Sequence, residues 1–369
     1  MWGISMSQRI SILCSGVALG VYVPGLLLGE SIAKNGEAYD AFVLESLFSE
    51  EKLEMVLRNK KAFHASFRVA LTGQKIPNNI GSSIDESKKA SLFRRWKEEG
   101  RKKFIVFTGF WLKLLEEYLV MAGIARENAQ ITIFHMDAEL SVSWKTVKDK
   151  LADYPNVWIF SGEENKVKGR IAIGDDCVVP FHDRSRRYVI HGGGWGMGTY
   201  RDRMSAIYDQ KLPIDLILYD RGEFLENEPL IHQYLLDPFW SPWETDSQGR
   251  LQFPRFGRVL GRDQVEYFSQ NNHGIFHLIK NSRAIISKPG GGTLLDSFAA
   301  ATPVIFLESF GKYEDENSRL WQELGYGITL EHFIKQGCRM QLLTEMHDRI
   351  LQDRGNVIEY GRVYAAKDQ

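Results

Sequence analysis

The chain has 369 residues, of which 44% are hydrophobic and 25% are charged, and its formal net charge is −1. These values predict a soluble globular protein of two domains, because a single core rarely extends beyond about 250–300 residues. The near-neutral charge gives no support to nucleic-acid binding by the whole chain. The three cysteines, Cys14, Cys177 and Cys338, lie far apart, fit no metal-site spacing and predict a reducing compartment, the cytoplasm.

An apolar run at residues 9–28 (RISILCSGVALGVYVPGLLL) mimics a signal peptide. Serines, glycines and a proline interrupt this run, and the following GESIAKNG continues a helical pattern. We therefore predict a strand (ISILCS), a glycine-containing loop and a helix. No other stretch reaches the roughly 20 apolar residues that a membrane span requires.

The N-terminal half alternates short apolar runs with helical patterns. The predicted strands are Ile10–Cys14, Ala41–Glu45, Phe104–Thr108, Ile131–Phe134 and Val157–Ser161. The predicted helices include residues 49–59, 85–99, 111–123 and 142–152. Such alternation is typical of βαβ units and predicts a mostly parallel sheet.

Residues 88–103 (KKASLFRRWKEEGRKK) combine two aromatic residues with many basic ones. This composition leaves association with an anionic membrane surface open. Glu98, Glu99 and the helical setting favour a solvated helix face instead.

After a polar, proline-containing segment at residues 178–187, the α/β pattern restarts. The predicted elements are strands at 188–191, 214–219, 283–287 and 303–308 and helices at 200–210 and 273–281. Residues 223–258, rich in aromatic residues, are predicted to be an ordered insertion. The whole pattern predicts two Rossmann-like domains facing each other across a cleft. We place the domains at residues 1–186 and 187–345, with a C-terminal helix at 346–369 that packs back on the first domain.

Two glycine-rich loops follow strands of the second domain. The first, GGGWGMGT (192–199), resembles a dinucleotide fingerprint, and Asp220 follows at a distance suitable for a ribose. It ends in Thr199 rather than glycine and opens the second domain, so a nicotinamide site is the weaker interpretation. We expect this loop to line the cleft between the domains.

The second loop lies in SKPGGGTLLDSFAAATPVIF (287–306), between a buried strand and a helix that carries Asp296. Free backbone N–H groups and the helix macrodipole make such a turn a site for an anion, often a phosphate. Alternative roles are helix packing for the glycines and a favourable helix-dipole contact for Asp296.

The order of glycine loop, carboxylate, A-A-x-x-P strand and EDEN (314–317) resembles the donor half of GT-B glycosyltransferases, specifically the MurG and UDP-glycosyltransferase group. The resemblance covers the C-terminal domain well and the N-terminal domain in outline. It implies that Asp296 binds the ribose hydroxyls, although the family usually has glutamate there. It also implies that Glu316 and Asn317 bind the donor sugar and that Gly194 approaches the phosphate and the acceptor. The alternative for Glu316 and Asn317 is an ordinary solvated loop. The residues implied to hold the diphosphate are Gly290, Gly291, Gly292 and Thr293.

The acceptor side matches the family less closely. The family often has a catalytic histidine in its first loop, but GVYVP (20–24) has Val21 there, and valine cannot accept a proton. The segment HMDAE (135–139) follows a strand and offers His135, Asp137 and Glu139 as candidate bases. His135 matches a family histidine, and we expect it to be the base, with Asp137 orienting its ring or contacting the acceptor. The alternatives are a structural role for His135 and helix capping for Asp137.

The resemblance implies a cytoplasmic enzyme that transfers a sugar from a UDP- or dTDP-sugar to a small-molecule or lipid-linked acceptor, with inversion. We expect no cofactor. We also expect no metal ion, because no Asp-x-Asp pair lies beside the proposed diphosphate site and the glycine loop supplies the positive potential there. A sugar-nucleotide epimerase or hydrolase of the same fold is an alternative. An NAD-dependent oxidoreductase and a catalytically inactive sugar-nucleotide sensor also stay open.

Overall fold

The computed structural model describes residues 9–17, 19–73, 83–269 and 273–366. A five-stranded parallel sheet forms the N-terminal half, in the order β2-β1-β3-β4-β5. Its strands are β1 (Ile10–Cys14), β2 (Tyr39–Val43), β3 (Lys103–Val106), β4 (Gln130–His135) and β5 (Asn156–Trp158). Each lies within two residues of its predicted start, and the parallel sheet is confirmed.

An eight-stranded sheet forms the C-terminal half, in the order β13-β12-β11-β10-β9-β14-β15-β16. Its strands are β9 (Tyr188–Ile190), β10 (Ile214–Leu218), β11 (Ile231–Leu236), β12 (Phe256–Gly261), β13 (Gln264–Tyr267), β14 (Ala284–Ser287), β15 (Val304–Phe306) and β16 (Gly327–Thr329). The pairings from β11 through β10, β9, β14 and β15 to β16 are parallel, whereas β12 and β13 add antiparallel edge strands.

The predicted insertion at 223–258 is therefore part of this sheet rather than an addition to it. It contains β11, which pairs with β10 along its length, and the first residues of β12. The sequence IHQYLL was not predicted as a strand, because it lacks the continuous β-branched run of the other core strands. The segment between the two strands covers the adjacent helix α1, where the Tyr22 hydroxyl donates to the Gln252 carbonyl at 2.7 Å.

Helices flank both sheets. In the N-terminal half they are α1 (Leu19–Lys34), α2 (Glu50–Ala65), α3 (Phe67–Gly73), α4 (Glu86–Glu98), α5 (Leu112–Ala122) and α6 (Val142–Lys145). The helix predicted at 142–152 is wrong in part, since α6 ends after one turn and a 3₁₀ helix follows at Lys148–Asp153. In α4, Phe93 and Trp96 point into the core, so these aromatic residues are not available to a membrane surface.

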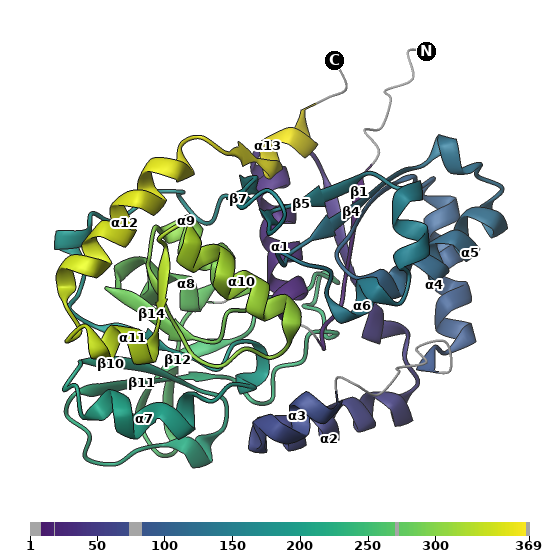
Figure 1. The fold of residues 1–369 in the computed structure, drawn as a ribbon. Helices are drawn as coiled ribbons and strands as arrows, with labels where there is room; N and C mark the ends of the chain where they lie inside the picture. Colours follow the sequence, from purple (N-terminus) through teal and green to yellow (C-terminus); the bar gives the residue numbers. More distant parts are fainter. Residues whose placement is uncertain (1–8, 18, 74–82, 270–272, 367–369) are drawn as a thin grey trace.

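In the C-terminal half the helices are α7 (Tyr200–Tyr208), α8 (Gly274–Asn281), α9 (Gly291–Ala300), α10 (Lys312–Glu323), α11 (Leu330–Lys335), α12 (Met340–Arg354) and α13 (Tyr360–Ala365). The chain returns to the N-terminal half through α13, which packs against α1 (Figure 1). Tyr360 of α13 makes an edge contact with Phe134 of β4, with ring centroids 5.1 Å apart. The segment predicted as one helix over 346–369 is instead the end of α12, a short strand, β17 (Ile358–Glu359), and α13. Helix α13 makes the contacts with the N-terminal half described here, and the domain boundaries stay predictions.

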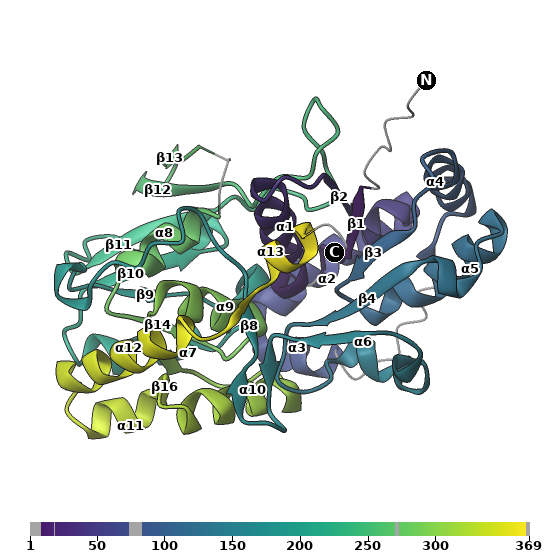
Figure 2. The same ribbon diagram turned by 90° about the horizontal axis from the view of Figure 1, so that it is seen from above.

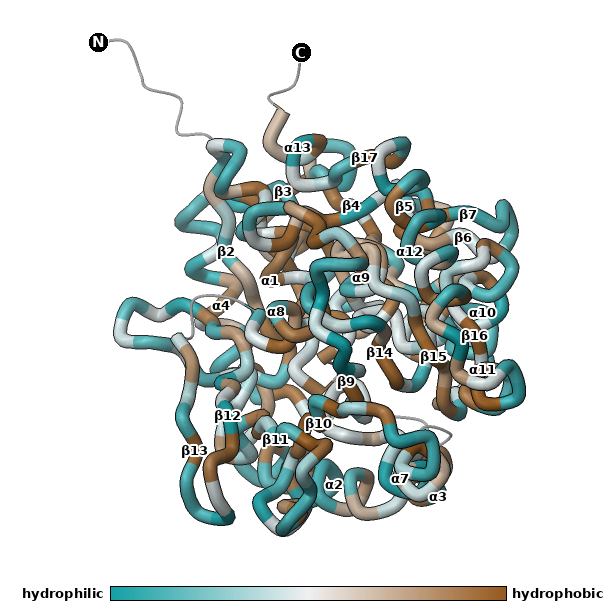
Figure 3. The backbone as a smooth tube through the Cα atoms, turned by 90° about the vertical axis from the view of Figure 1, so that its left-hand side faces the viewer, coloured by the Kyte–Doolittle hydropathy of each residue, from teal (hydrophilic) through white to brown (hydrophobic). Residues whose placement is uncertain are grey.

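Helix α1 lies between the two halves of the molecule (Figure 2). It contacts β1 and β2 on one side and α9 and α13 on the others, and most of its residues are buried. A helix enclosed on all sides is apolar all round. This explains why its sequence mimics a signal peptide. The apolar strands of the C-terminal sheet likewise run through the interior, as the brown segments of β14 and β15 show (Figure 3).

Candidate functional site

The N-terminus of α9 is the centre of the candidate site. Gly290 is its N-cap, and no side chain caps the first turn from within the segment. Gly291 and Thr293 are buried, and the Cα of Gly20 in α1 lies 3.7 Å from where a Cβ on Gly292 would stand. The loop therefore presents backbone N–H groups and the positive end of a helix dipole at the interface between the two halves.

Asp137, from the segment after β4, lies directly against this helix terminus. Its carboxylate accepts a hydrogen bond from the Gly291 backbone N–H. The Met136 carbonyl is so close that a Cβ on Gly291 would stand 2.2 Å from it, which requires glycine at this position. Burial raises the pKa of Asp137 to about 6, while its hydrogen bond to Asn317 and the nearby Lys288 act in the opposite direction.

Asn317 of α10 joins the two halves through its side-chain amide. Its Oδ1 accepts from the Ala138 backbone N–H at 2.7 Å. Its Nδ2 donates to Asp137 Oδ1 at 2.9 Å and to the Pro289 carbonyl at 2.8 Å. Asn317 is fully buried, so in this structure its amide connects the 135–139 segment with the glycine loop.

Lys288 and Glu314 form a buried ion pair beside the glycine loop, which sequence reasoning did not find. The Lys288 Nζ lies 3.2 Å from the position of a Cβ on Gly290. Glu314 also accepts from the Phe310 backbone N–H at 2.7 Å. The signal was present in the sequence, since a lysine that directly follows a buried strand and precedes PGGG is a charged residue at a strand end.

Asp296 lies one turn further along α9 and pairs with His273, the residue before α8. His273 Nε2 and Asp296 Oδ2 are 3.0 Å apart, and both side chains are about one-tenth exposed. Asp296 therefore has a specific partner rather than a general helix-dipole contact. Sequence reasoning did not find His273, which becomes recognisable only when α8 packs against α9.

The loop after β9 approaches both α1 and Lys288. A Cβ on Gly194 would stand 2.8 Å from that of Leu19, and Gly193, with φ +73°, packs against the Lys288 side chain. The Gly193 N–H donates to His191 Nδ1 at 3.0 Å. As predicted for a cleft-lining loop, this segment lies between the two halves.

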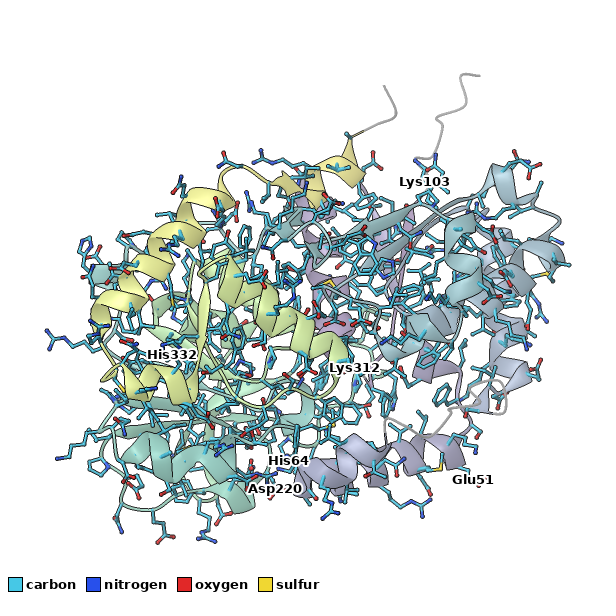
Figure 4. All side chains as sticks on the ribbon, in the orientation of Figure 1. Glu51, His64, Lys103, Asp220, Lys312 and His332 are labelled. Carbon is cyan, nitrogen blue, oxygen red and sulfur yellow. The ribbon has the colours of Figure 1, made fainter. Side chains whose placement is uncertain are left out.

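The loop at residues 192–199 is held by contacts with α2 of the N-terminal half. Asp220, the candidate ribose ligand of a dinucleotide site, has a different role. His64 Nδ1 lies 3.2 Å from the Gly196 carbonyl, and His64 Nε2 lies 3.3 Å from Glu223. The Asp220 carboxylate accepts from the Gly222 N–H at 2.7 Å and caps the short 3₁₀ helix Arg221–Glu223. Figure 4 labels His64 and Asp220 at this junction. Asp220 thus has a local capping role in this structure.

His135 ends β4 inside an aromatic cage. Its ring stacks on Trp158 with centroids 3.9 Å apart and also contacts Trp144. Its Nε2 donates to Asn156 Oδ1 at 2.7 Å, and burial lowers its pKa to about 4. The enclosed imidazole is therefore neutral at physiological pH, and its free Nδ1 faces no partner among the described residues.

The two other predicted carboxylates lie on the surface. Glu139 forms an ion pair with Lys145 at 3.2 Å, and Glu316 pairs with Arg319 at 2.8 Å. Both side chains are more than one-third exposed. The structure therefore brings Asp137, Asn317 and the glycine loop together, whereas the carboxylates of Glu139 and Glu316 are held in ion pairs with Lys145 and Arg319.

The loop after β1 is held by a carboxylate that sequence reasoning did not single out. Glu45 is buried and accepts hydrogen bonds from the Ser15 hydroxyl at 2.6 Å, the Gly16 N–H at 2.7 Å and the Val17 N–H at 3.3 Å. Burial raises its pKa. Val21 lies in the first turns of α1 and packs against the core.

Two further features of the described residues bear on function. None of their helices is both long and apolar enough to cross a membrane. They also contain no group of three or more His, Cys, Asp or Glu side chains arranged to hold a metal ion.

Searches against known proteins add structural neighbours only. No protein-family model matches the chain, and no curated protein matches its sequence. Among solved structures, MurG of Acinetobacter baumannii is 12% identical, with 97% of each chain covered and a TM-score of 0.53. The glycosyltransferase SnogD of Streptomyces nogalater is 13% identical, covering 97% of this chain and 98% of that one, with a TM-score of 0.53.

A third neighbour is SsfS6 of Streptomyces sp. SF2575, a glycosyltransferase whose structure contains thymidine diphosphate. It is 10% identical, covers 96% of this chain and 98% of its own, and has a TM-score of 0.53. At identities of 10–13% these matches support the fold alone. The predicted architecture is thereby confirmed: the chain has the GT-B fold, two Rossmann-like halves that face each other.

Proposed function

We propose that this protein is a glycosyltransferase that uses a nucleoside-diphosphate sugar, UDP- or dTDP-linked, and acts in the cytoplasm. The observation that carries the proposal is the glycine-capped N-terminus of α9, which opens toward the other half of a GT-B fold. Backbone N–H groups and a helix dipole stabilise a diphosphate leaving group as its charge develops. Asp296, with its partner His273, is suited to accept hydrogen bonds from the ribose.

We assign the base to Asp137 rather than to His135, although the sequence favoured the histidine. A carboxylate with a pKa of about 6 can accept a proton at neutral pH, and it lies beside the diphosphate site. His135 is enclosed by tryptophans and already donates to Asn156. The acceptor hydroxyl would lose its proton to Asp137 as it displaces the nucleoside diphosphate at the anomeric carbon, which gives inversion.

The test is binding followed by turnover. A nucleotide that binds the folded protein raises its melting temperature in proportion to the logarithm of its concentration. We expect UDP or TDP to raise it, and NAD to have no effect. Incubation with the matching sugar nucleotide alone then separates the classes, since an epimerase or hydrolase acts without an acceptor. Stabilisation by NAD without any effect of UDP or TDP would contradict the proposal.

We expect Asp296→Ala to weaken nucleotide binding by about 1.5–3 kcal/mol, because a charged acceptor of ribose hydrogen bonds is lost. The measurement is calorimetric titration of UDP and TDP into folded protein. His273→Ala is the companion variant, since it keeps the carboxylate but removes its partner, and it should weaken binding less. Unchanged affinity in Asp296→Ala would limit this residue to a structural role.

We expect turnover to persist in EDTA. The described residues offer no cluster of three metal-ligating side chains, and the backbone N–H groups of α9 supply positive potential at the phosphates. Rates measured with EDTA, and again after addition of Mg²⁺ or Mn²⁺, should agree within about twofold. Loss of activity in EDTA with recovery in Mn²⁺ would refute the metal-independent mechanism.

A further inference from the structure

We propose that Lys288 and His191 are donor-site residues that bind the diphosphate together with the N-terminus of α9. This inference rests on the proposed function and adds to it the side chains that supply charge and a hydrogen bond. Neither residue was singled out by the sequence. They follow two adjacent strands of the C-terminal sheet, β14 and β9, at the ends where parallel α/β sheets bind ligands.

Lys288 is the cation that connects the two glycine loops. Its Cε lies 2.8 Å from the position of a Cβ on Gly193, and its Nζ lies 3.2 Å from that of a Cβ on Gly290. Its side chain is about nine-tenths buried, and Glu314 on α10 holds its ammonium group. A side chain other than glycine at position 193 would collide with this lysine, so the loop leaves room for it.

His191 has a hydrogen-bond donor with no acceptor. Its Nδ1 accepts from the Gly193 N–H, so in the neutral ring the proton resides on Nε2. Burial lowers the pKa of His191 to about 3, with Lys288 and His273 acting in the same direction, so the ring is neutral. The Nε2 atom is buried and has no partner among the described residues. A buried donor without an acceptor is rare, and a ligand oxygen would satisfy it.

Asp137 already brings a carboxylate to the group of side chains around Lys288, and burial raises its pKa to about 6. Its carboxylate binds the Gly291 N–H and Asn317 Nδ2, and Lys288 favours its ionised form. Asp137 and Glu314 together bring more negative than positive charge to this group of side chains. On this proposal the diphosphate displaces the Asp137 carboxylate toward the acceptor and takes its place beside Lys288 and the α9 N–H groups.

The experiment compares nucleotide with nucleoside. Calorimetry measures the affinities of UDP and TDP, and of uridine and thymidine, which lack the phosphates. We expect Lys288→Met to weaken diphosphate binding about 10–100-fold and to reduce its dependence on salt, with nucleoside affinity unchanged. Glu314→Gln should tighten diphosphate binding, because it removes a competing charge. A purely structural ion pair predicts losses in both variants and for both ligand types, which would overturn the proposal.

Matched variants keep the result interpretable. If Lys288→Met leaves Glu314 unpaired and fails to fold, the double variant Lys288→Met/Glu314→Gln is compared with Glu314→Gln. The double variant should then show the same loss of diphosphate affinity.

The histidine is tested by a second pair of variants. His191→Asn keeps an acceptor for the Gly193 N–H but lacks the distal N–H, so diphosphate affinity should fall about tenfold. His191→Gln, which can place a donor distally, should lose less. If the ratio of diphosphate affinity to nucleoside affinity is the same in the wild type and in all variants, the proposal is wrong. A wild-type protein that binds neither UDP nor TDP would instead refute the proposed function.

Discussion

Replacing Asp137 with asparagine should lower kcat by about 10²–10⁴-fold, the usual contribution of a positioned general base. Asparagine has nearly the same shape and can still accept a hydrogen bond from Asn317. Nucleotide affinity should stay the same or increase, because the variant lacks a negative charge beside the diphosphate site. Steady-state kinetics and calorimetry on the same preparation would show whether kcat falls while nucleotide affinity stays the same or increases.

The pH profile provides an independent measurement on the wild-type enzyme. Because the Asp137 pKa is raised to about 6, the base is ionised above this pH and protonated below it. We expect kcat to fall as pH decreases through about 6, while the affinity for the anionic donor increases over the same range. Asp137→Asn should abolish both trends.

Controls distinguish the candidate bases. Asp149→Asn, which alters an exposed carboxylate of the same half, should have no effect. An inactive His135→Gln or Glu139→Gln, combined with normal turnover of Asp137→Asn, would transfer the role of base to that residue.

The largest expected effect on stability is that of Arg184→Met, which should destabilise the protein by about 3 kcal/mol or more. The buried Arg184 guanidinium donates to the Val179, Ser282 and Ala300 carbonyls and to the Thr302 hydroxyl. Hydrogen bonds from a charged donor contribute about 1.5–3 kcal/mol each, and removal leaves buried acceptors unsatisfied. Methionine keeps the apolar stem but cannot donate.

The measurement is the midpoint of thermal or urea unfolding. Arg186→Met, two residues away and exposed, is the matched control and should change the midpoint little. Since Arg184 joins the segment before β9 to α9 and β14, equal midpoints for both variants would show that this connection does not limit stability.

Much of the architecture was determined by local sequence. The strand at Ile10–Cys14 was predicted from its apolar run, and helix α9, which begins within PGGG, from the glycines before it and the proline after it. Each of these signals depends on only a few neighbouring residues, so it can be recognised without knowledge of the tertiary fold. The resemblance in residues 287–317 added the GT-B arrangement, which the structural neighbours confirm. The limits of local signals show in β11, whose burial comes from its sheet neighbours rather than from its own pattern.

The candidate site was decided mainly by tertiary structure. The sequence identified the segment 135–139 as a strand end near the cleft, but not which side chain meets the donor loop. Trp158 and Trp144 enclose His135, while the turn after β4 carries Asp137 to the Gly291 N–H. The roles of Lys288, Glu314 and His273 follow from partners that lie far from them in the chain. The role of His191 follows from the partner that its Nε2 lacks among the described residues. Charge, burial and pKa are properties of such assembled neighbourhoods, so no local pattern specifies them.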